Sequence, residues 1–331
     1  MGSRMEQLLD NAKQDVEMDD FDFGEAVACL IGLDGRGEKR IANMDLSHID
    51  QDSVMSPDIH TLTSSGTRRQ YPGASHHLSD LDSRDGLREL GQVQDEISEY
   101  TVGYSILTCH VEDKEDLEKL RKVTEVCVER SWFTLPVVTY DSDVPLSKMF
   151  EVSEASDTFV PISDDVSLDE CHFETSDSLT ATVSEYLLYV LSAPTFEEDV
   201  HGFYCPISGH REEILHGGGI ATVRIGSVET VTQNDVETAL KKEYSTKYDS
   251  SHDEGQVARC LSFLAIEEGG LGQDTERSEK LLSVDELSGI AHDTLGSEPS
   301  VFRLAGQELP GLEKTRLLLL SVYNSPELVS G

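Results

Sequence analysis

The sequence predicts an α+β or mixed α/β fold, because one segment has the pattern strand, helix, strand and short apolar elements alternate with polar turns elsewhere. Residues 102–106 alternate apolar and polar side chains, as a half-buried strand does. Asp113 can cap a helix that runs to about Arg130 with its apolar residues on one face. A second strand begins at residues 133–137. This βαβ-like unit is the clearest folded signal in the chain.

Further elements follow the same reasoning. Residues 183–192 form an apolar and aromatic run, whose length fits either a buried helix or a buried strand. The other expected elements are strands at 220–225 and 301–304, helices at 235–248 and 283–295, and apolar segments at 257–266 and 312–323. Together they extend the mixed α/β pattern to the end of the chain.

The first hundred residues differ from the rest in composition. Apart from a short apolar run at residues 26–33, they are rich in acidic, Ser, Thr, Gly and His residues. Low hydrophobicity with high charge is typical of a segment that does not fold alone. We therefore expect an extended acidic N-terminal arm at residues 1–100 before a compact body, whose mixed α/β subdomains span 101–195 and 196–331.

The charge excludes some partners. The chain of 331 residues carries 64 acidic and 26 basic side chains, for a formal net charge of −38. Nucleic acid needs a concentrated basic surface, and anionic membranes repel the same sign of charge, so neither is expected as a direct partner. Such a charge makes a compact protein repel itself. Salt, bound cations or basic neighbours must therefore screen it.

Cysteine usage and hydropathy bear on the compartment. The six cysteines are scattered without a close pair, and no secretory signal or membrane-spanning apolar stretch is found in the sequence. Reduced thiols are typical of proteins inside a cell. An intracellular or virion location is therefore expected, without secretion or a transmembrane segment.

One loop has a spacing that resembles a metal site. His201, Cys205, His210 and His216 offer imidazole and thiolate ligands of the kind that zinc prefers. The second cysteine of a standard zinc pair is missing, and a polar surface loop explains the same residues. These four are weak candidate metal ligands.

Other motifs for chemistry are absent or uninformative. Residues 80–91 fail the calcium-loop pattern, and the sequence holds no P-loop, dinucleotide fingerprint or G-x-S-x-G elbow. The acidic pairs Asp141/Asp143 and Asp164/Asp165 can collect hard cations loosely, as any carboxylate cluster can, and no cofactor or dedicated cation site is predicted. No catalytic residues are assigned, and an enzyme is disfavoured.

These observations predict a function in assembly. The leading hypothesis is a non-enzymatic structural protein that self-associates, most concretely a capsid-associated subunit of a virus particle whose arm packs on its neighbours. The alternative is an acidic regulatory protein that binds and neutralises a basic protein partner. The sequence shows no resemblance to a known family.

Overall fold

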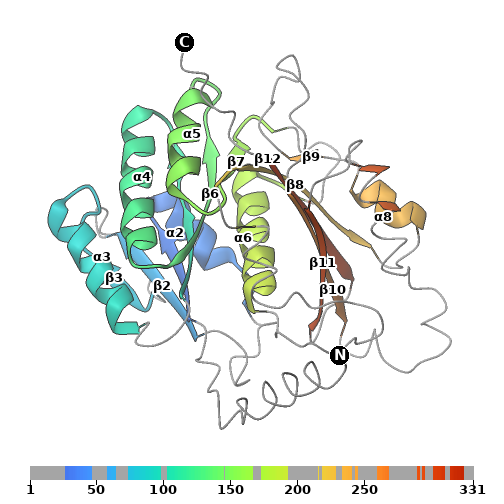
Figure 1. Cartoon of the computed structure of the whole chain (residues 1–331), viewed down its shortest axis with the longest axis horizontal. Coiled ribbons are helices and arrows are strands. Elements are labelled where there is room, and N and C mark those ends of the chain that lie inside the picture. Colours follow the sequence, from blue (N-terminus) through green and yellow to red (C-terminus); the bar gives the residue numbers. More distant parts are fainter. Residues whose placement is uncertain are drawn as a thin grey trace, which may run out of the picture.

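The structure is a computed structural model. It describes residues 27–46, 58–64, 74–97, 103–144, 146–166, 173–192, 215, 218–228, 233–240, 243–244, 259–267, 289–290, 293–294, 301–309 and 314–323. Within these ranges the strands form two sheets, and a long helix, α6, lies between them (Figure 1).

The first sheet is parallel in every strand pair that the structure describes. Its strands are β1 (Val27–Gly32), β2 (Asp58–Ser64), β3 (His76–Leu78), β4 (Gly103–Thr108), β5 (His110–Val111), β6 (Phe133–Tyr140) and β7 (Val160–Ser163). Their order is β3-β2-β1-β4-β6-β5, and β7 also pairs with β6. The strand order therefore reverses direction between β1 and β4. Such a point is where open α/β sheets bind ligands.

Helices cover both faces of this sheet. The face toward the second sheet is covered by α2 (Gly35–Asn43) and α6 (Ser176–Ser192), and the opposite face by α3 (Arg84–Ile97), α4 (Lys114–Glu129) and α5 (Leu146–Ala155) (Figure 1). A parallel sheet covered on both faces needs strands that are apolar throughout. β1 fits this requirement, and every residue of β1 and β4 is buried, including the polar Ser105 and Thr108 of β4.

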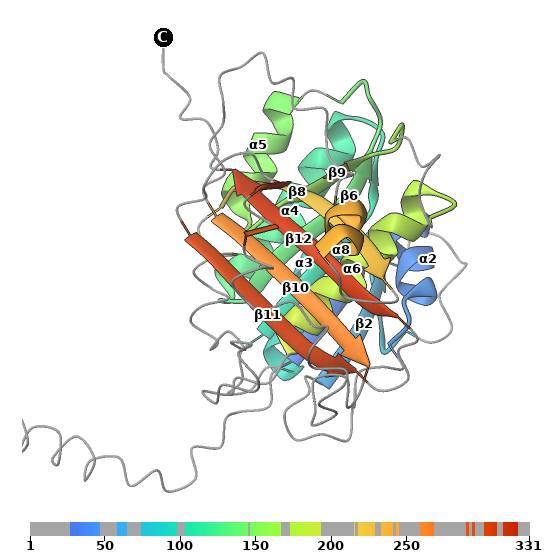
Figure 2. The ribbon, with the colours of Figure 1, turned by 90° about the vertical axis from the view of Figure 1, so that its right-hand side faces the viewer.

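The second sheet is mixed. It contains β8 (Ile220–Val228), β9 (Glu243–Tyr244), β10 (Arg259–Glu267), β11 (Val301–Leu309) and β12 (Thr315–Tyr323), in the order β11-β10-β12-β8-β9. β10 and β11 are parallel, whereas β12 is antiparallel to both β10 and β8. A short helix, α8 (Gln233–Ala239), follows β8, and Figure 2 shows these strands side by side in front of α6.

Helix α6 joins the two sheets into one core. Its side chains pack with Leu135 and Val137 of the first sheet and with Leu318 and Leu320 of the second. A helix that is covered all round has no polar stripe. This explains why the run at 183–192 did not distinguish a helix from a strand, and the structure shows that it is a helix.

The structure confirms the predicted α/β class and its βαβ-like unit, which is β4, α4 and β6. Asp113 caps α4 as expected, and the side chain of Asp116 completes a capping box. The strands expected at 220–225 and 301–304 are β8 and β11, and the apolar segments at 257–266 and 312–323 contain β10 and β12. The helix expected at 283–295 lies mostly outside the described residues.

The extended arm is corrected over the part that the structure describes. Residues 27–97 contribute β1, β2, β3, α2 and α3 to the first sheet and its helices, and β1 lies between β2 and β4. The polar loops around these elements lowered the average hydrophobicity over the first hundred residues and concealed a central strand. Residues 1–26 and the boundary expected between 195 and 196 lie outside the described residues.

Candidate functional site

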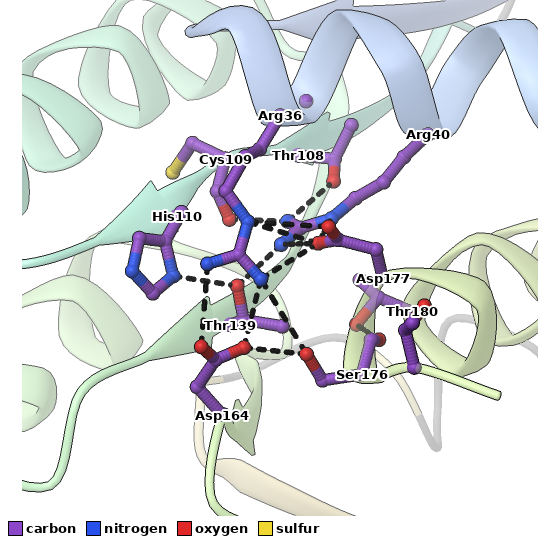
Figure 3. Close-up of polar contacts among 12 residues, drawn as sticks. Arg36, Arg40, Thr108, Cys109, His110, Thr139, Asp164, Ser176, Asp177 and Thr180 are labelled. Carbon is purple, nitrogen blue, oxygen red and sulfur yellow. Dashed lines mark hydrogen bonds and ion pairs between the residues drawn. The ribbon is translucent and has the colours of Figure 1, made fainter.

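Polar side chains gather where β1, β4, β6 and β7 end, next to the reversal of strand order. They come from the start of α2, the residues after β4, the ends of β6 and β7, and the start of α6 (Figure 3). Because all these strands are parallel, their carboxyl ends share one edge of the sheet. In this class of sheet, that edge is the expected place for a ligand.

The first helix at this edge carries its own carboxylate. Asp34 caps α2, since one of its oxygens accepts a hydrogen bond from Gly37 N and the other accepts one from His110 N at 2.7 Å. A Cβ atom at Gly37 would lie 2.1 Å from the carbonyl oxygen of Thr108, so only glycine permits this close packing of α2 on β4. A helix N-terminus is a ready site for an anion. Here the anion is the side chain of Asp34.

The N-terminus of α4 at the same edge is also acidic. The carboxylate of Asp113 accepts hydrogen bonds from the backbone of Glu115 and Asp116, and Asp116 in turn accepts one from Glu112 N. The turn from β4 to α4, residues 109–113, contains no glycine that would let a backbone cradle form around a phosphate. Carboxylates thus occupy both helix N-termini.

A buried arginine lies behind this edge. The side chain of Arg40 is fully buried, and its Nη2 atom lies 2.6 Å from Asp177 Oδ1. Its guanidinium also donates to the carbonyl of Cys109 and to the hydroxyls of Thr108 and Thr139. A buried charge is tolerated only when it is paired and hydrogen-bonded, as this one is.

A second arginine, one turn earlier on α2, is nearer to solvent. Arg36 Nη2 lies 2.7 Å from Asp164 Oδ1, and Arg36 Nε lies 3.1 Å from Asp177 Oδ1. Figure 3 shows both arginines entering from α2, with the two carboxylates meeting them from the opposite side. The hydrogen bond from Arg36 lowers the pKa of Asp164. Burial acts to raise the pKa of Asp177, but its bonds with Arg36 and the charge of Arg40 lower it overall.

A histidine completes the group. The ring of His110 is buried, with Nδ1 lying 2.8 Å from Thr139 Oγ1 and Nε2 lying 3.4 Å from Asp141 Oδ1. Ligand atoms of His110, Asp141 and Asp164 lie within 4.8 Å of one another, which among the described residues makes them a group able to hold a metal ion.

The four metal-ligand candidates, His201, Cys205, His210 and His216, lie outside the described residues. Of the acidic pairs, one member each, Asp141 and Asp164, belongs to the group around His110. The sequence reasoning did not identify Arg36, Arg40, His110 or Asp177. A usable signal existed for Arg36, His110 and Asp177, because each of them closely follows a buried strand or begins a helix at the same edge. Arg40 lies in the last turn of α2 and carried no such signal.

No family model matches the chain, and no curated protein sequence matches it either. Within the described residues, no helix has both the length and the apolar character needed to cross a membrane.

Solved structures do match over nearly the whole chain. An empty FtsZ dimer from M. jannaschii is 13% identical with a TM-score of 0.61, over 97% of this chain and 92% of that one. CetZ2 from Haloferax volcanii, a GTPγS-bound protofilament, is 12% identical with a TM-score of 0.59, over 91% and 94%. TubZ from Bacillus thuringiensis serovar israelensis, in GDP-form protofilaments, is 9% identical with a TM-score of 0.55, over 96% and 90%.

These matches correct the functional hypothesis. The proteins that share the architecture are FtsZ, CetZ and TubZ, so the prediction of a capsid-associated virion subunit is wrong. The same matches give no support to the alternative of an acidic regulator that neutralises a basic partner. The parallel sheet with its flanking helices, the connecting helix α6 and the second sheet together are an FtsZ/tubulin-like fold.

Proposed function

We propose that this protein self-assembles into filaments. The observation that carries the proposal is the match to proteins solved as protofilaments, CetZ2 and TubZ, over more than nine-tenths of the chain. Filaments arise when one surface of a subunit binds a different surface of the next and the rotation does not close. The net charge of −38 opposes such contacts between copies. Assembly should therefore need salt or cations to screen it.

The test of assembly is sedimentation of the full chain over a range of protein and salt concentrations, with negative-stain electron microscopy of the pellet. Filaments that appear above a threshold protein concentration, and more readily near 1 M salt, where the screening length is about 3 Å, would support the proposal. A monomer or a closed ring of fixed size under all these conditions would contradict it.

Nucleotide hydrolysis is a second candidate function, because CetZ2 was solved with GTPγS and TubZ with GDP. The carboxylates of Asp34 and Asp113 count against it, since they occupy the helix N-termini that would otherwise face a phosphate. Arg36 and Arg40 are already engaged by Asp164 and Asp177. We therefore propose that assembly does not depend on GTP.

Two measurements separate these candidates. Binding of a fluorescent GTP analogue is measured with and without Mg²⁺, and phosphate release is followed under the conditions in which filaments form. Equal filament mass with and without GTP, with no phosphate release, is the expected result. Filaments that form only with GTP would overturn GTP-independent assembly and leave the proposal of self-assembly standing.

A further inference from the structure

We propose that His110, Asp141 and Asp164 bind one divalent transition-metal ion, with Zn²⁺ as the best match. The three side chains offer one imidazole nitrogen and two carboxylate oxygens from the ends of neighbouring strands. Zinc is bound by nitrogen and oxygen ligands of this kind, and three protein ligands leave a further position for water. An all-oxygen set would instead favour magnesium or calcium. The inference does not rest on filament formation.

The spacing of the first two ligands suits a metal. Ligands at about 2.1 Å from a tetrahedral zinc ion are about 3.4 Å from each other. His110 Nε2 and Asp141 Oδ1 are 3.4 Å apart, which is long for a charged hydrogen bond. An ion could therefore enter between these two atoms with little change in their separation.

One carboxylate oxygen of the third ligand, Asp164, is only weakly hydrogen-bonded. Asp164 Oδ1 accepts hydrogen bonds from Arg36 Nη2 and from Ser176 Oγ, while Oδ2 lies 3.3 Å from Arg36 Nη1. Oδ2 is thus the more weakly engaged oxygen and keeps a lone pair for a metal. The side chain of Asp164 is 30% exposed, so an ion from solvent can reach its carboxylate.

The histidine is already held in a suitable orientation. Its ring is buried, and Nδ1 faces the hydroxyl of Thr139 at 2.8 Å (Figure 3). Nε2 on the other side of the ring faces Asp141. With a metal on Nε2, Nδ1 carries the hydrogen and donates it to Thr139 Oγ1. Ligating histidines are commonly fixed in this way by a partner on the other ring nitrogen.

The local charge is also unbalanced in favour of a cation. Among the described side chains of this group, Asp164 and Asp177 contact the guanidinium groups of Arg36 and Arg40, while Asp34 accepts from His110 N and Asp141 lies beside the His110 ring. Four negative charges face two positive ones, and a divalent ion would make the group neutral. Asp141 is 49% exposed, which gives an ion from solvent a route to the site.

The experiment is calorimetric titration of Zn²⁺ into the full chain, with the matched variants Asp141→Asn and Asp143→Asn. Both substitutions remove one charge from the same turn, but Asp143 is exposed and lies outside the ligand group. Salt near 1 M and excess Mg²⁺ suppress binding to scattered carboxylates. Wild type and Asp143→Asn should bind one ion that Asp141→Asn binds at least about tenfold more weakly.

Zinc held elsewhere in the chain cannot imitate this result, because it would be unaffected by Asp141→Asn. Equal binding by wild type and Asp141→Asn would overturn the proposal, as would equal weakening in both variants. A second readout is histidine-selective ¹⁵N NMR of wild type and Asp143→Asn, with His110→Gln used only to assign the His110 signal by its absence. Zn²⁺ should shift that one imidazole signal in both proteins. No shift of that signal would also overturn the site.

Discussion

Helix α6 is held at its start and at its middle by different kinds of ion pair. At its start, Asp177 meets Arg36 and Arg40, and its side chain is 25% exposed. At its middle, Glu185 lies 2.6 Å from Arg316 Nη1 of β12, accepts a hydrogen bond from Tyr189, and is only 6% exposed. The first pair ties α6 to α2 and the first sheet, whereas the second ties it to the second sheet.

The two carboxyl groups respond oppositely to their surroundings. The pKa of Asp177 is lowered, because bonds and charge from two arginines outweigh its burial. The pKa of Glu185 is raised, because desolvation outweighs the help of Tyr189 and Arg316. The free energy needed to remove a carboxylate from water exceeds the free energy gained from its ion pair with a single arginine. We therefore expect the start of α6 to depend on its charges more than its middle does.

The largest expected effect is from Arg40→Leu, which leaves Asp177 with Arg36 alone. Removing one partner of a buried pair costs about 3–5 kcal/mol, and we expect a loss near the lower figure because Asp177 is partly exposed. Chemical denaturation measures the free energy of unfolding. Arg88→Leu, at an exposed side chain of α3, makes the same chemical change and should alter the free energy of unfolding by less than about 0.5 kcal/mol. Similar losses in both would contradict the importance of the network.

Close packing of α2 on β4 is required for Arg36 and Arg40 to reach their partners. Gly37→Ala would place a Cβ atom 2.1 Å from the carbonyl oxygen of Thr108, and the backbone must shift to relieve it. Overpacking of this kind costs roughly 1–3 kcal/mol. Gly35→Ala is the control, since its Cβ would meet nothing within 4 Å. If both variants unfold at the same denaturant concentration, steric overlap with the carbonyl of Thr108 is not the cause of the loss.

Glu185, at the middle of α6, should affect the pH dependence of stability. Because the pKa of Glu185 is higher in the folded state than its usual 4.5, the folded protein holds a proton that the unfolded chain releases first. Stability therefore falls as pH rises from 4.5 to the raised value, with a slope of at most about 1.4 kcal/mol per pH unit.

Glu185→Gln should remove this contribution in unfolding measurements made across that range. Glu118→Gln is the control. The hydrogen bond from Arg121 lowers the pKa of Glu118, so protonation of Glu118 changes the stability only at pH values below about 4.5. If wild type and Glu185→Gln show the same slope above pH 4.5, the raised pKa is not correct.

An exposed network on α4 gives the smallest expected effect and a baseline for the two ion-pair sites on α6. Arg121 bonds with Glu118 and Glu125 on the helix surface. Arg121→Ala should cost about 0.5 kcal/mol or less, and the cost should decrease with added salt. Unfolding in low and high salt measures this difference. A cost equal to that of Arg40→Leu would show that burial does not set the contribution of these pairs.

Local patterns predicted the parts of the fold that depend on nearby residues. The strand at 102–106, the cap at Asp113 and the following helix involve side chains close together in sequence. The central strand β1 was visible only as an apolar run at 26–33, because its neighbours β2 and β4 are not adjacent to it in the chain. The run at 183–192 was ambiguous because apolar residues surround α6 on all sides.

The candidate site could be predicted only in part for the same reason. Asp141 and Asp164 were noted as acidic residues that could attract cations, and both belong to the group around His110. The bond from Arg36 to Asp177 joins residues 141 positions apart, and nothing in the local sequence pairs them. Such a pairing follows only after the strand order is known.

The position of α6 also has a consequence during synthesis. The first sheet and α6 can form once the chain has reached residue 192, but the apolar face of α6 that meets Leu318 and Leu320 stays uncovered until β12 is made. At ordinary translation rates the remaining stretch to residue 323 takes roughly 7–26 s. During that interval the apolar face of α6 on the nascent chain is accessible to chaperones and to other chains. Synthesis of β12 then covers this face and reduces the risk of aggregation.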